Sequence, residues 1–316
     1  MIKEIIDYTR SLKNLITATI KDYLCRFIFL FVRKRYRNTK YYFSICCIFK
    51  NEARYFKEWL EFHKIIGVDH VYAYNNDSDD NYLEVLKPYI EEGFVTLIDF
   101  PGQYAQFPAY EHCYNNYGQE TYWLSYVDLD EFIVPTELAD IKEWIRPYEK
   151  YPSIVFYWLM FGTNGIVESS SDKLVIEQFT NSFKSIRNTG KIALNTSFEP
   201  VKMYHHYIYC WMNVLGIRIK IPTIDEHKKF VFFYSNHKVN KHYTVQMNHY
   251  WSKSLSDYVK KIDKGDMVDK KHDEIRKQLD FFFWHEHQNV RDDKVIFRFL
   301  AELKMALWDI RLVFKK

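Results

Sequence analysis

The feature that most constrains the fold is a regular alternation of apolar runs and amphipathic segments that begins at Tyr41. The run YYFSICCIF (41–49) is almost continuously apolar, β-branched or aromatic, which is typical of a strand buried on both faces of a parallel sheet. It is followed by segments with a helical pattern at 52–67 and 82–93 and with a strand pattern at 68–74 and 94–100. This order predicts the α/β class: a mostly parallel, doubly wound mixed sheet flanked by helices, with right-handed crossovers.

The pattern of apolar and charged residues divides the chain into three parts. Residues 1–40 carry apolar side chains at helical spacing and end in a dense basic block, which predicts an amphipathic, basic helical arm. Residues 41–260 hold the strand–helix alternation, and residues 261–316 are expected to be a helical extension that ends in an amphipathic helix. A chain of 316 residues suits one large domain with accessory helices better than two full domains.

Two interpretations of the arm stay open. Lys21, Asp22 and Arg26 interrupt its apolar run, so it falls short of a membrane-spanning helix, and its start lacks the pattern of a cleaved signal peptide. In the first interpretation the arm lies in a membrane surface, with the basic residues of 33–40 facing anionic lipid headgroups. In the second it packs against its own domain or against a second copy of the chain.

Composition disfavours several classes of function. A formal net charge of +3 is too small to indicate nucleic-acid binding. The five cysteines show no paired spacing and no CxxC motif, which predicts reduced thiols in a cytosolic protein and argues against a structural zinc site. No GxGxxG or Walker-type glycine loop and no HExxH motif occurs, which argues against a dinucleotide dehydrogenase, a P-loop kinase and a zinc hydrolase.

The next apolar run, ETYWLSYVDLDEFIVP (120–135), which we expect to be the fourth strand, leads into three carboxylates within four positions: Asp128, Asp130 and Glu131. Strand periodicity places Asp128 and Asp130 on the same side, where their charges repel unless a cation or a proton lies between them. Hard oxygen ligands of this kind suit Mg²⁺ or Mn²⁺ on a diphosphate. A solvated acidic turn is the alternative, but the position of Asp128, Asp130 and Glu131 between apolar residues favours a metal site.

The order of elements and several stretches resemble the GT-A glycosyltransferases, and more narrowly glycosyltransferase family 92 with its family-2-like bacterial relatives. The matching stretches fall in order between Ile45 and Leu255: ICCIFKNEARYFKEWLEFHKIIGVDHVYAYNNDSDDNYLEVLKPYI, VTLIDFPGQ, YVDLDEFIVP, WLMFG, LVIEQF, KSI and NHYWSKSL. The resemblance implies a GT-A nucleotide-diphospho-sugar transferase fold over 41–260. It also implies metal-dependent transfer of a sugar, with a UDP-hexose as the expected donor, to a glycan or a lipid-linked saccharide.

The resemblance further implies roles for residues at matching positions. Asp128 and Asp130 resemble the DxD motif that holds Mn²⁺ or Mg²⁺ on the donor diphosphate, and His249 is placed like the distal histidine that completes the metal shell. Asn75 stands where an Asp is expected, so it would accept a hydrogen bond from the nucleotide without carrying charge. The residues expected to bind the nucleotide sugar are Asn51, Glu52, Asn75, Asn76, Asp80, Asp128, Lys184 and Lys253.

The same resemblance implies inversion at the anomeric carbon by one in-line displacement, with the metal and Lys253 stabilising the departing diphosphate. A carboxylate must take the proton of the acceptor hydroxyl. Glu168, Asp172 and Glu131 are the catalytic candidates, and Glu168 is preferred because it lies in the expected acceptor segment. That segment departs from the family pattern near Ile166, so the acceptor is not inherited from known members.

Two other functions stay open: a non-catalytic carbohydrate-binding or scaffold protein at a membrane, and a sugar-phosphate nucleotidyltransferase. The first leaves the coincidence of Asp128, Asp130 and His249 unexplained, and the second normally needs a Gly-rich loop that FKNEAR lacks. The basic arm, the thiols and the missing signal suggest a bacterial enzyme peripheral to the cytoplasmic face of the inner membrane. A lipopolysaccharide or capsule precursor is then the expected acceptor.

Overall fold

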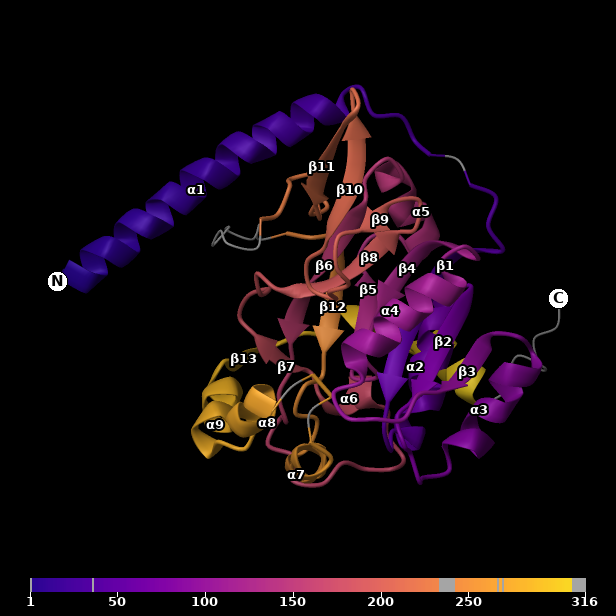
Figure 1. The fold of residues 1–316 in the computed structure, drawn as a ribbon. Coiled ribbons are helices and arrows are strands. Elements are labelled where there is room, and N and C mark those ends of the chain that lie inside the picture. Colours follow the sequence, from indigo (N-terminus) through magenta and orange to yellow (C-terminus); the bar gives the residue numbers. More distant parts are fainter. Residues whose placement is uncertain (1, 36, 233–241, 266, 269, 309–316) are drawn as a thin grey trace.

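A central sheet of eight strands organises the part of the chain that the structure, a computed structural model, describes: residues 2–35, 37–232, 242–265, 267–268 and 270–308. The strands follow the order β3-β2-β1-β4-β8-β6-β12-β5 across the sheet (Figure 1). Their bounds are β1 Tyr41–Phe49, β2 His70–Asn75, β3 Val95–Asp99, β4 Thr121–Tyr126, β5 Glu131–Pro135, β6 Ser153–Met160, β8 Gly190–Asn195 and β12 Val245–His249.

Parallel pairing predominates in this sheet. β1 pairs in parallel with β2 and β4, β2 with β3, and β6 with β12. The pairs β4–β8, β8–β6 and β12–β5 are antiparallel. The expected α/β class with a mostly parallel mixed sheet is therefore confirmed. β1 has the bounds of its apolar run, and its residues Phe43, Ile45, Cys46 and Cys47 have no exposed surface, as a strand covered on both faces requires.

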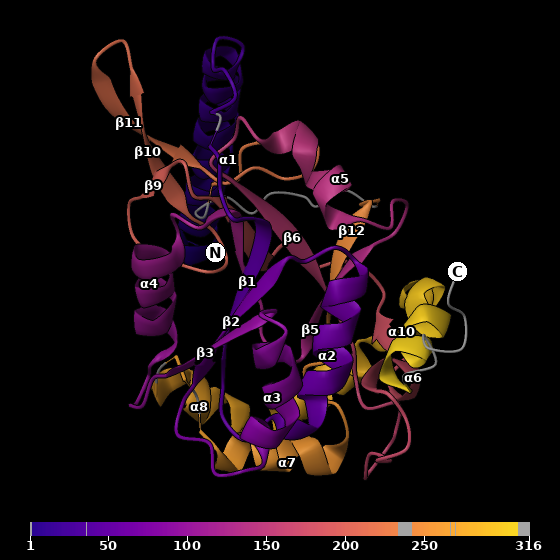
Figure 2. The same ribbon diagram turned by 90° about the vertical axis from the view of Figure 1, so that its right-hand side faces the viewer.

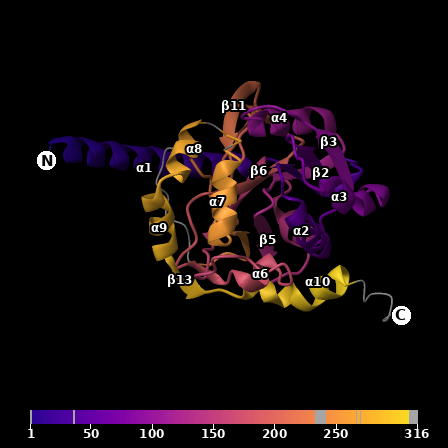
Figure 3. The same cartoon turned by 90° about the horizontal axis from the view of Figure 1, so that it is seen from below.

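Helices cover the faces and the lower edge of the sheet. Seen from below, α4 lies on one side of β2 and β3, and α2 lies on the other (Figure 3). The helix α7 runs beneath the edge where β1, β4 and β12 end (Figure 1). The helices of the main domain are α2 Ala53–Ile65, α3 Tyr82–Glu91, α4 Gln106–Tyr117, α5 Ile141–Ile145, α6 Val175–Gln178 and α7 Leu255–Asp263. Small strands complete it: β7 Asn181–Phe183, β9 Glu199–Pro200, β10 Tyr209–Val214 and β11 Ile217–Pro222.

The segment expected to be a single fourth strand forms two strands, β4 and β5, at different places in the sheet. The chain turns between them, with the Glu131 N–H donating to the Asp128 carbonyl at 3.0 Å. The indole of Trp59 donates to the carbonyls of both Asp128 and Glu131, at 3.1 and 2.8 Å. Strand alternation therefore does not order the carboxylates as expected, because Asp128 and Asp130 lie in a turn.

The N-terminal arm is helical, as expected. α1 (Ile2–Phe29) projects from the main domain (Figure 1, Figure 2). Ala18, Asp22, Cys25 and Phe29 form a buried stripe, in which Asp22 accepts a hydrogen bond from the Phe230 N–H at 2.7 Å. The helix thus packs on its own domain along this stripe. A second apolar face stays exposed, made of Leu12, Leu15, Ile16, Ile20, Tyr23, Leu24 and Phe27.

None of the helices in the described ranges combines the length and the apolar character needed to cross a membrane.

The C-terminal part also contains helices, as expected. The boundary placed at residue 260 falls inside α7, and α8 (Lys270–Arg276), α9 (Leu279–His287) and α10 (Leu300–Leu307) follow. A strand, β13 (Asn289–Asp292), pairs with β7 in a separate two-stranded sheet, which ties the extension to the main domain. α10 packs on α2 (Figure 2), and its Leu303 is buried. The end of the expected amphipathic helix, residues 309–316, lies outside the described residues.

Candidate active site

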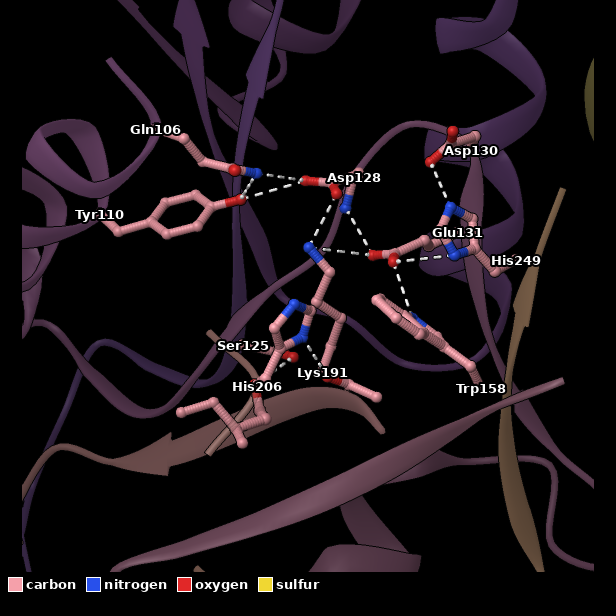
Figure 4. Close-up of polar contacts among 12 residues, drawn as sticks. Gln106, Tyr110, Ser125, Asp128, Asp130, Glu131, Trp158, Lys191, His206 and His249 are labelled. Carbon is pink, nitrogen blue, oxygen red and sulfur yellow. Dashed lines mark hydrogen bonds and ion pairs between the residues drawn. The ribbon is translucent and has the colours of Figure 1, made fainter. Parts of the chain in front are cut away.

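The sheet brings four polar side chains to its lower edge. Asp128 and Asp130 lie in the turn after β4, Glu131 is the first residue of β5, and His249 is the last residue of β12. His249 pairs with Glu131 across the antiparallel β12–β5 ladder. Residues more than a hundred positions apart therefore meet because one turn and one strand pairing place them together (Figure 4).

Asp128 is bound by a buried lysine. The Lys191 ammonium lies 2.7 Å from the Asp128 carboxylate, and Gln106 and Tyr110 of α4 donate to the other carboxylate oxygen at 3.2 and 3.1 Å (Figure 4). Burial disfavours the charge of Asp128, but the charge and the hydrogen bond of Lys191, together with His249, lower the pKa of the carboxyl. Asp128 is therefore an anion held in place by three donors.

Gly190 lets the strand that carries Lys191 approach its neighbour. A Cβ at Gly190 would lie 1.8 Å from the carbonyl oxygen of Phe156 in β6, a distance no side chain tolerates. The Lys191 side chain, 1% exposed, reaches from β8 towards the turn after β4. The close approach of β8 and β6 thus fixes the position of the ammonium.

Glu131 lies inside the protein and has no exposed side chain. Its carboxylate accepts from the Asp128 N–H at 2.9 Å and from the Trp158 indole at 2.8 Å, and it lies 3.5 Å from Lys191. Burial, together with the neighbouring carboxylate of Asp128, raises the pKa of Glu131 well above its usual range. Glu131 therefore stabilises the turn through the Asp128 N–H and fixes the side chain of Trp158.

Asp130 faces two bases at once. One oxygen lies 2.6 Å from the Lys261 ammonium and the other lies 3.5 Å from Nε2 of His249. Although burial disfavours its charge, Lys261 and His249 hold the pKa of Asp130 well below its usual range. Burial lowers the pKa of His249, so its imidazole is neutral near pH 7 and retains a lone pair for a metal.

Asp130 and His249 fit a divalent cation as adjacent ligands. With metal–ligand bonds of roughly 2.1 Å, two neighbouring ligands lie about 3–3.5 Å apart, which matches the 3.5 Å between Oδ1 and Nε2. Nδ1 of His249, buried without a hydrogen-bond partner, lies 3.7 Å from Glu131 and is directed at the kind of carboxylate that orients a metal-bound histidine. No three His, Cys, Asp or Glu side chains of the described ranges form a complete metal-binding group. Diphosphate oxygens and water commonly supply the remaining ligands of Mg²⁺.

A cleft of about 270 Å³ opens beside these residues at the ends of β1–β3. It is lined by Lys50, Glu52, Asn76, Gly102, Gln103, Tyr104, Lys261, Lys264, Gly265 and Met267. Two residues expected to bind the nucleotide sugar, Glu52 and Asn76, are among them. The Lys264 ammonium lies 3.1 Å from the Glu52 carboxylate and donates to the Asn51 carbonyl at 2.7 Å, so it closes one side of the cleft.

The other polar residues of this region form loop contacts. Asn75 donates to Tyr82 and Asp99, both at 2.9 Å, and Asp80 accepts from the Ala53 N–H at the start of α2 at 2.8 Å. The Asn51 side chain accepts from the Asp79 N–H at 2.9 Å. These three residues join the loops after β1 and β2, and Asn75 turns its amide towards Asp99.

The two lysines expected at the donor differ in their surroundings. Lys253 is buried, with a backbone φ of +51° and its ammonium 4.3 Å from the centre of the Tyr55 ring. Burial opposes its charge, but the carboxylates of Glu52 and Asp130 raise the pKa of Lys253 above its usual range. Lys184 is exposed beyond β7, and among the described residues it makes no ion pair with the carboxylate cluster.

The expected acceptor segment is attached to the start of α7. The N–H groups of Leu255 and Ser256 donate to the carbonyls of Ile166 and Val167, at 3.1 and 2.9 Å, and Ser169 donates to Asp257 at 2.6 Å. Glu168, in the middle of these contacts, is exposed, and so is Asp172 further along the loop. Of the three base candidates, these two face solvent and Glu131 does not.

Sequence reasoning missed Lys191, Lys261 and Lys264. A lone lysine inside an apolar strand, as in GKIALN, is a usable signal, because a buried ammonium needs an anionic partner. Lys261 and Lys264 carry no such signal, since lysines on an amphipathic helix normally face water. Their contacts depend on where α7 lies relative to the sheet.

Removing the Lys191 charge should destabilise the protein strongly. Lys191→Met leaves the fully buried Glu131 beside the partly exposed Asp128 without a cation, which should lower the free energy of unfolding by about 3–5 kcal/mol in urea denaturation. Lys202→Met, at an exposed position, should change it little. A loss below about 1 kcal/mol for Lys191→Met would show that the ammonium is not needed by the cluster.

Comparisons with known proteins show the family of the chain. The model of glycosyltransferase family 92 matches residues 39–281. A glycosyltransferase family 92 protein of Oryza sativa subsp. japonica is 29% identical over 122 residues, which cover 38% of this chain and 21% of that protein. Galactan beta-1,4-galactosyltransferase GALS3 of Arabidopsis thaliana is 31% identical over 108 residues, which cover 30% of this chain and 21% of that protein. The chain spans about a fifth of the length of these curated relatives.

Among solved structures, S. aureus TarS 1–349 aligns over 49% of this chain and 47% of that chain, with 13% identity and a TM-score of 0.35. The family match extends over most of the sequence and includes Asp128, Asp130 and His249. The chain belongs to glycosyltransferase family 92.

Proposed function

We propose that the protein is a metal-dependent, inverting glycosyltransferase that moves a hexose from a UDP donor to a glycan or a lipid-linked saccharide. The observation that carries the proposal is the pair Asp130 and His249, which meet at 3.5 Å beside an open cleft in a chain of glycosyltransferase family 92. The non-catalytic and nucleotidyltransferase alternatives are supported by no comparable feature.

The donor nucleotide would lie in the cleft at the ends of β1–β3. Ligands of open α/β sheets bind beyond the carboxyl ends of their strands, and Glu52 and Asn76 line the cleft there. Asn75 would contribute indirectly, because its amide is engaged by Tyr82 and Asp99. Tyr104, 44% exposed at the rim, offers an aromatic face to the base.

Asp130 and His249 would hold Mn²⁺ or Mg²⁺, and such an ion would neutralise negative charge on the donor diphosphate when bound. Lys253 would add a fixed positive charge near the same point, because its ammonium is buried and kept protonated. A preorganised cation in a site with little water stabilises a leaving diphosphate more than a mobile surface lysine does. Asp128 is paired with Lys191. It would therefore position the turn and face the donor, and it would not hold the ion by itself.

Glu168 would act as the general base. It is exposed, and the hydrogen bonds of Val167 and Ser169 to α7 fix the loop on both sides of it. Glu131 suits this role poorly, since it is buried and accepts hydrogen bonds from Asp128 and Trp158.

The arm would bind the protein to a membrane. The exposed apolar face of α1 lies close in sequence to Arg33, Lys34, Arg35, Arg37 and Lys40, the combination that binds anionic lipid surfaces. The proposed location is the cytoplasmic face of a bacterial inner membrane, with a lipopolysaccharide or capsule precursor as acceptor.

Metal-dependent binding of UDP tests the donor site. In calorimetric titration, wild type should bind UDP with Mn²⁺ present and much more weakly without it. Asp130→Ala should weaken the metal-dependent binding by about a hundredfold. Mutation of a residue that only hydrogen-bonds to a metal ligand already lowers metal affinity by about 10–100-fold, and Asp130 is proposed as a ligand itself. Asp292→Ala, at an exposed position on β13, is the matched control and should bind as wild type does.

Absence of binding by wild type to both UDP and GDP, with and without metal, would defeat the proposal and favour a scaffold. Formation of a UDP-sugar from UTP and a sugar 1-phosphate would instead identify a nucleotidyltransferase.

Substitution of the proposed base should slow the reaction without weakening donor binding. Glu168→Gln should lower the rate of UDP-hexose hydrolysis by about 10²–10⁴-fold, the usual worth of a general base, while the affinity for UDP stays unchanged. Asp172→Asn, in the same loop, should have a small effect on both. Equal rates for Glu168→Gln and wild type would remove Glu168 from this role.

Polar substitution of the exposed face of α1 should release the protein from membranes. Ile20, Leu24 and Phe27 can be changed to Ser together, because they lie opposite the buried stripe that docks the helix. Cosedimentation with phosphatidylglycerol-containing vesicles should fall about tenfold or more, since each side chain loses apolar burial. The control Thr17→Ser with Thr19→Ser should bind as wild type does. Unchanged cosedimentation of the triple variant would contradict the membrane role.

A further inference from the structure

Two lysines, Lys261 in the last turn of α7 and Lys264 directly after the helix, reach the acidic residues of the site. The Lys261 ammonium lies 2.6 Å from the Asp130 carboxylate and donates to the Trp251 carbonyl at 3.1 Å. Lys264, one turn further, lies 3.1 Å from Glu52. Residues three apart on a helix share a face. Lys261 and Lys264 therefore point to the same side, and both line the cleft at the ends of β1–β3.

Lys261 differs from Lys191 and Lys253 in its exposure to solvent. Lys191 is 1% exposed and lies between two carboxylates, and Lys253 is buried against the Tyr55 ring. The side chains of Lys261 and Lys264 are each 24% exposed. An anion that enters the cleft can therefore reach the Lys261 ammonium, and Asp130 keeps a cationic partner if a divalent cation takes the place of Lys261.

We propose that Lys261 couples the binding of the divalent cation to the binding of the donor, by moving from Asp130 to the diphosphate when both bind. This inference rests on the proposed function. Asp130 presents one oxygen to His249 and the other to Lys261, so a cation held by Asp130 and His249 would lie close to the Lys261 ammonium. Like charges at such a separation repel strongly where water is scarce.

The diphosphate removes the repulsion between the divalent cation and the Lys261 ammonium, because it places negative charge between them. A divalent cation alone competes with Lys261 for Asp130, and a diphosphate alone finds Lys261 engaged by Asp130. When both bind, the cation takes Asp130 and Lys261 takes a phosphate oxygen. Each ligand therefore raises the affinity for the other, and the coupling is reciprocal by thermodynamic necessity.

The test compares wild type with Lys261→Met, which keeps most of the apolar stem and removes the charge. Binding of Mn²⁺ alone, of UDP alone and of Mn²⁺ at saturating UDP is measured by electron paramagnetic resonance of free Mn²⁺ and by calorimetry. In wild type, UDP should tighten Mn²⁺ binding strongly. In Lys261→Met, Mn²⁺ alone should bind several-fold more tightly, and the coupling factor should fall by about tenfold, within the range typical of coupled sites.

Two further variants separate this role from a structural one. Lys260→Met removes an exposed lysine of the same helix and should leave both quantities unchanged. Lys261→Arg keeps a cation and should retain the coupling. Melting temperatures within the range of wild type verify that the variants are folded.

The outcomes distinguish the inference from the proposed function. If wild type binds Mn²⁺ and UDP, but Lys261→Met shows the same Mn²⁺ affinity and the same coupling factor, the inference is wrong and the proposed function stands. If wild type does not bind UDP at all, the proposed function fails and the inference fails with it.

Discussion

A single buried ammonium compensates the carboxylates on which the rest of the site depends. Lys191 lies 2.7 Å from the partly exposed Asp128 and 3.5 Å from the fully buried Glu131, so it is the cation that both acids share. Because Asp128 is fixed, the turn after β4 keeps its conformation, and Asp130 at the end of this turn faces His249. Gly190 makes this possible, since only glycine lets β8 pack this close to β6. The stability of the sheet and the geometry of the site are therefore parts of one arrangement.

The helix α7 connects the proposed acceptor loop around Glu168 with the proposed donor cleft at the ends of β1–β3. Its first turn binds the loop around Glu168, through the Ser256 N–H and the Asp257 carboxylate. Its last turn and the residue after it carry Lys261 and Lys264 to the cleft at the ends of β1–β3. A shift of this one helix would move charges on the donor side and a carboxylate on the acceptor side together. Such a link suits a reaction in which both substrates must be in place before transfer.

The sequence predicts those parts of this arrangement that depend on local patterns. The apolar run of β1 gives its bounds, and Asp130 and His249 could be paired because their flanking stretches match the family. The partners of the carboxylates could not be predicted, because Lys191 and Lys261 meet them through strand order and helix placement, which no local pattern records. The amide of Asn75 was expected at the nucleotide, yet it bonds to Asp99, since the strand β3 that carries Asp99 ends beside β2. Long-range pairing decides these contacts.

The most direct test of a donor site at this edge of the sheet is a crystal structure with UDP and Mn²⁺ bound. We predict that the uridine lies in the cleft lined by Glu52, Asn76 and Tyr104, and that Asp130 and His249 bind the ion beside the diphosphate. Nucleotide found elsewhere, for example in the cleft lined by Arg54, Ser169 and Lys173, which Asp130 does not line, would contradict this prediction.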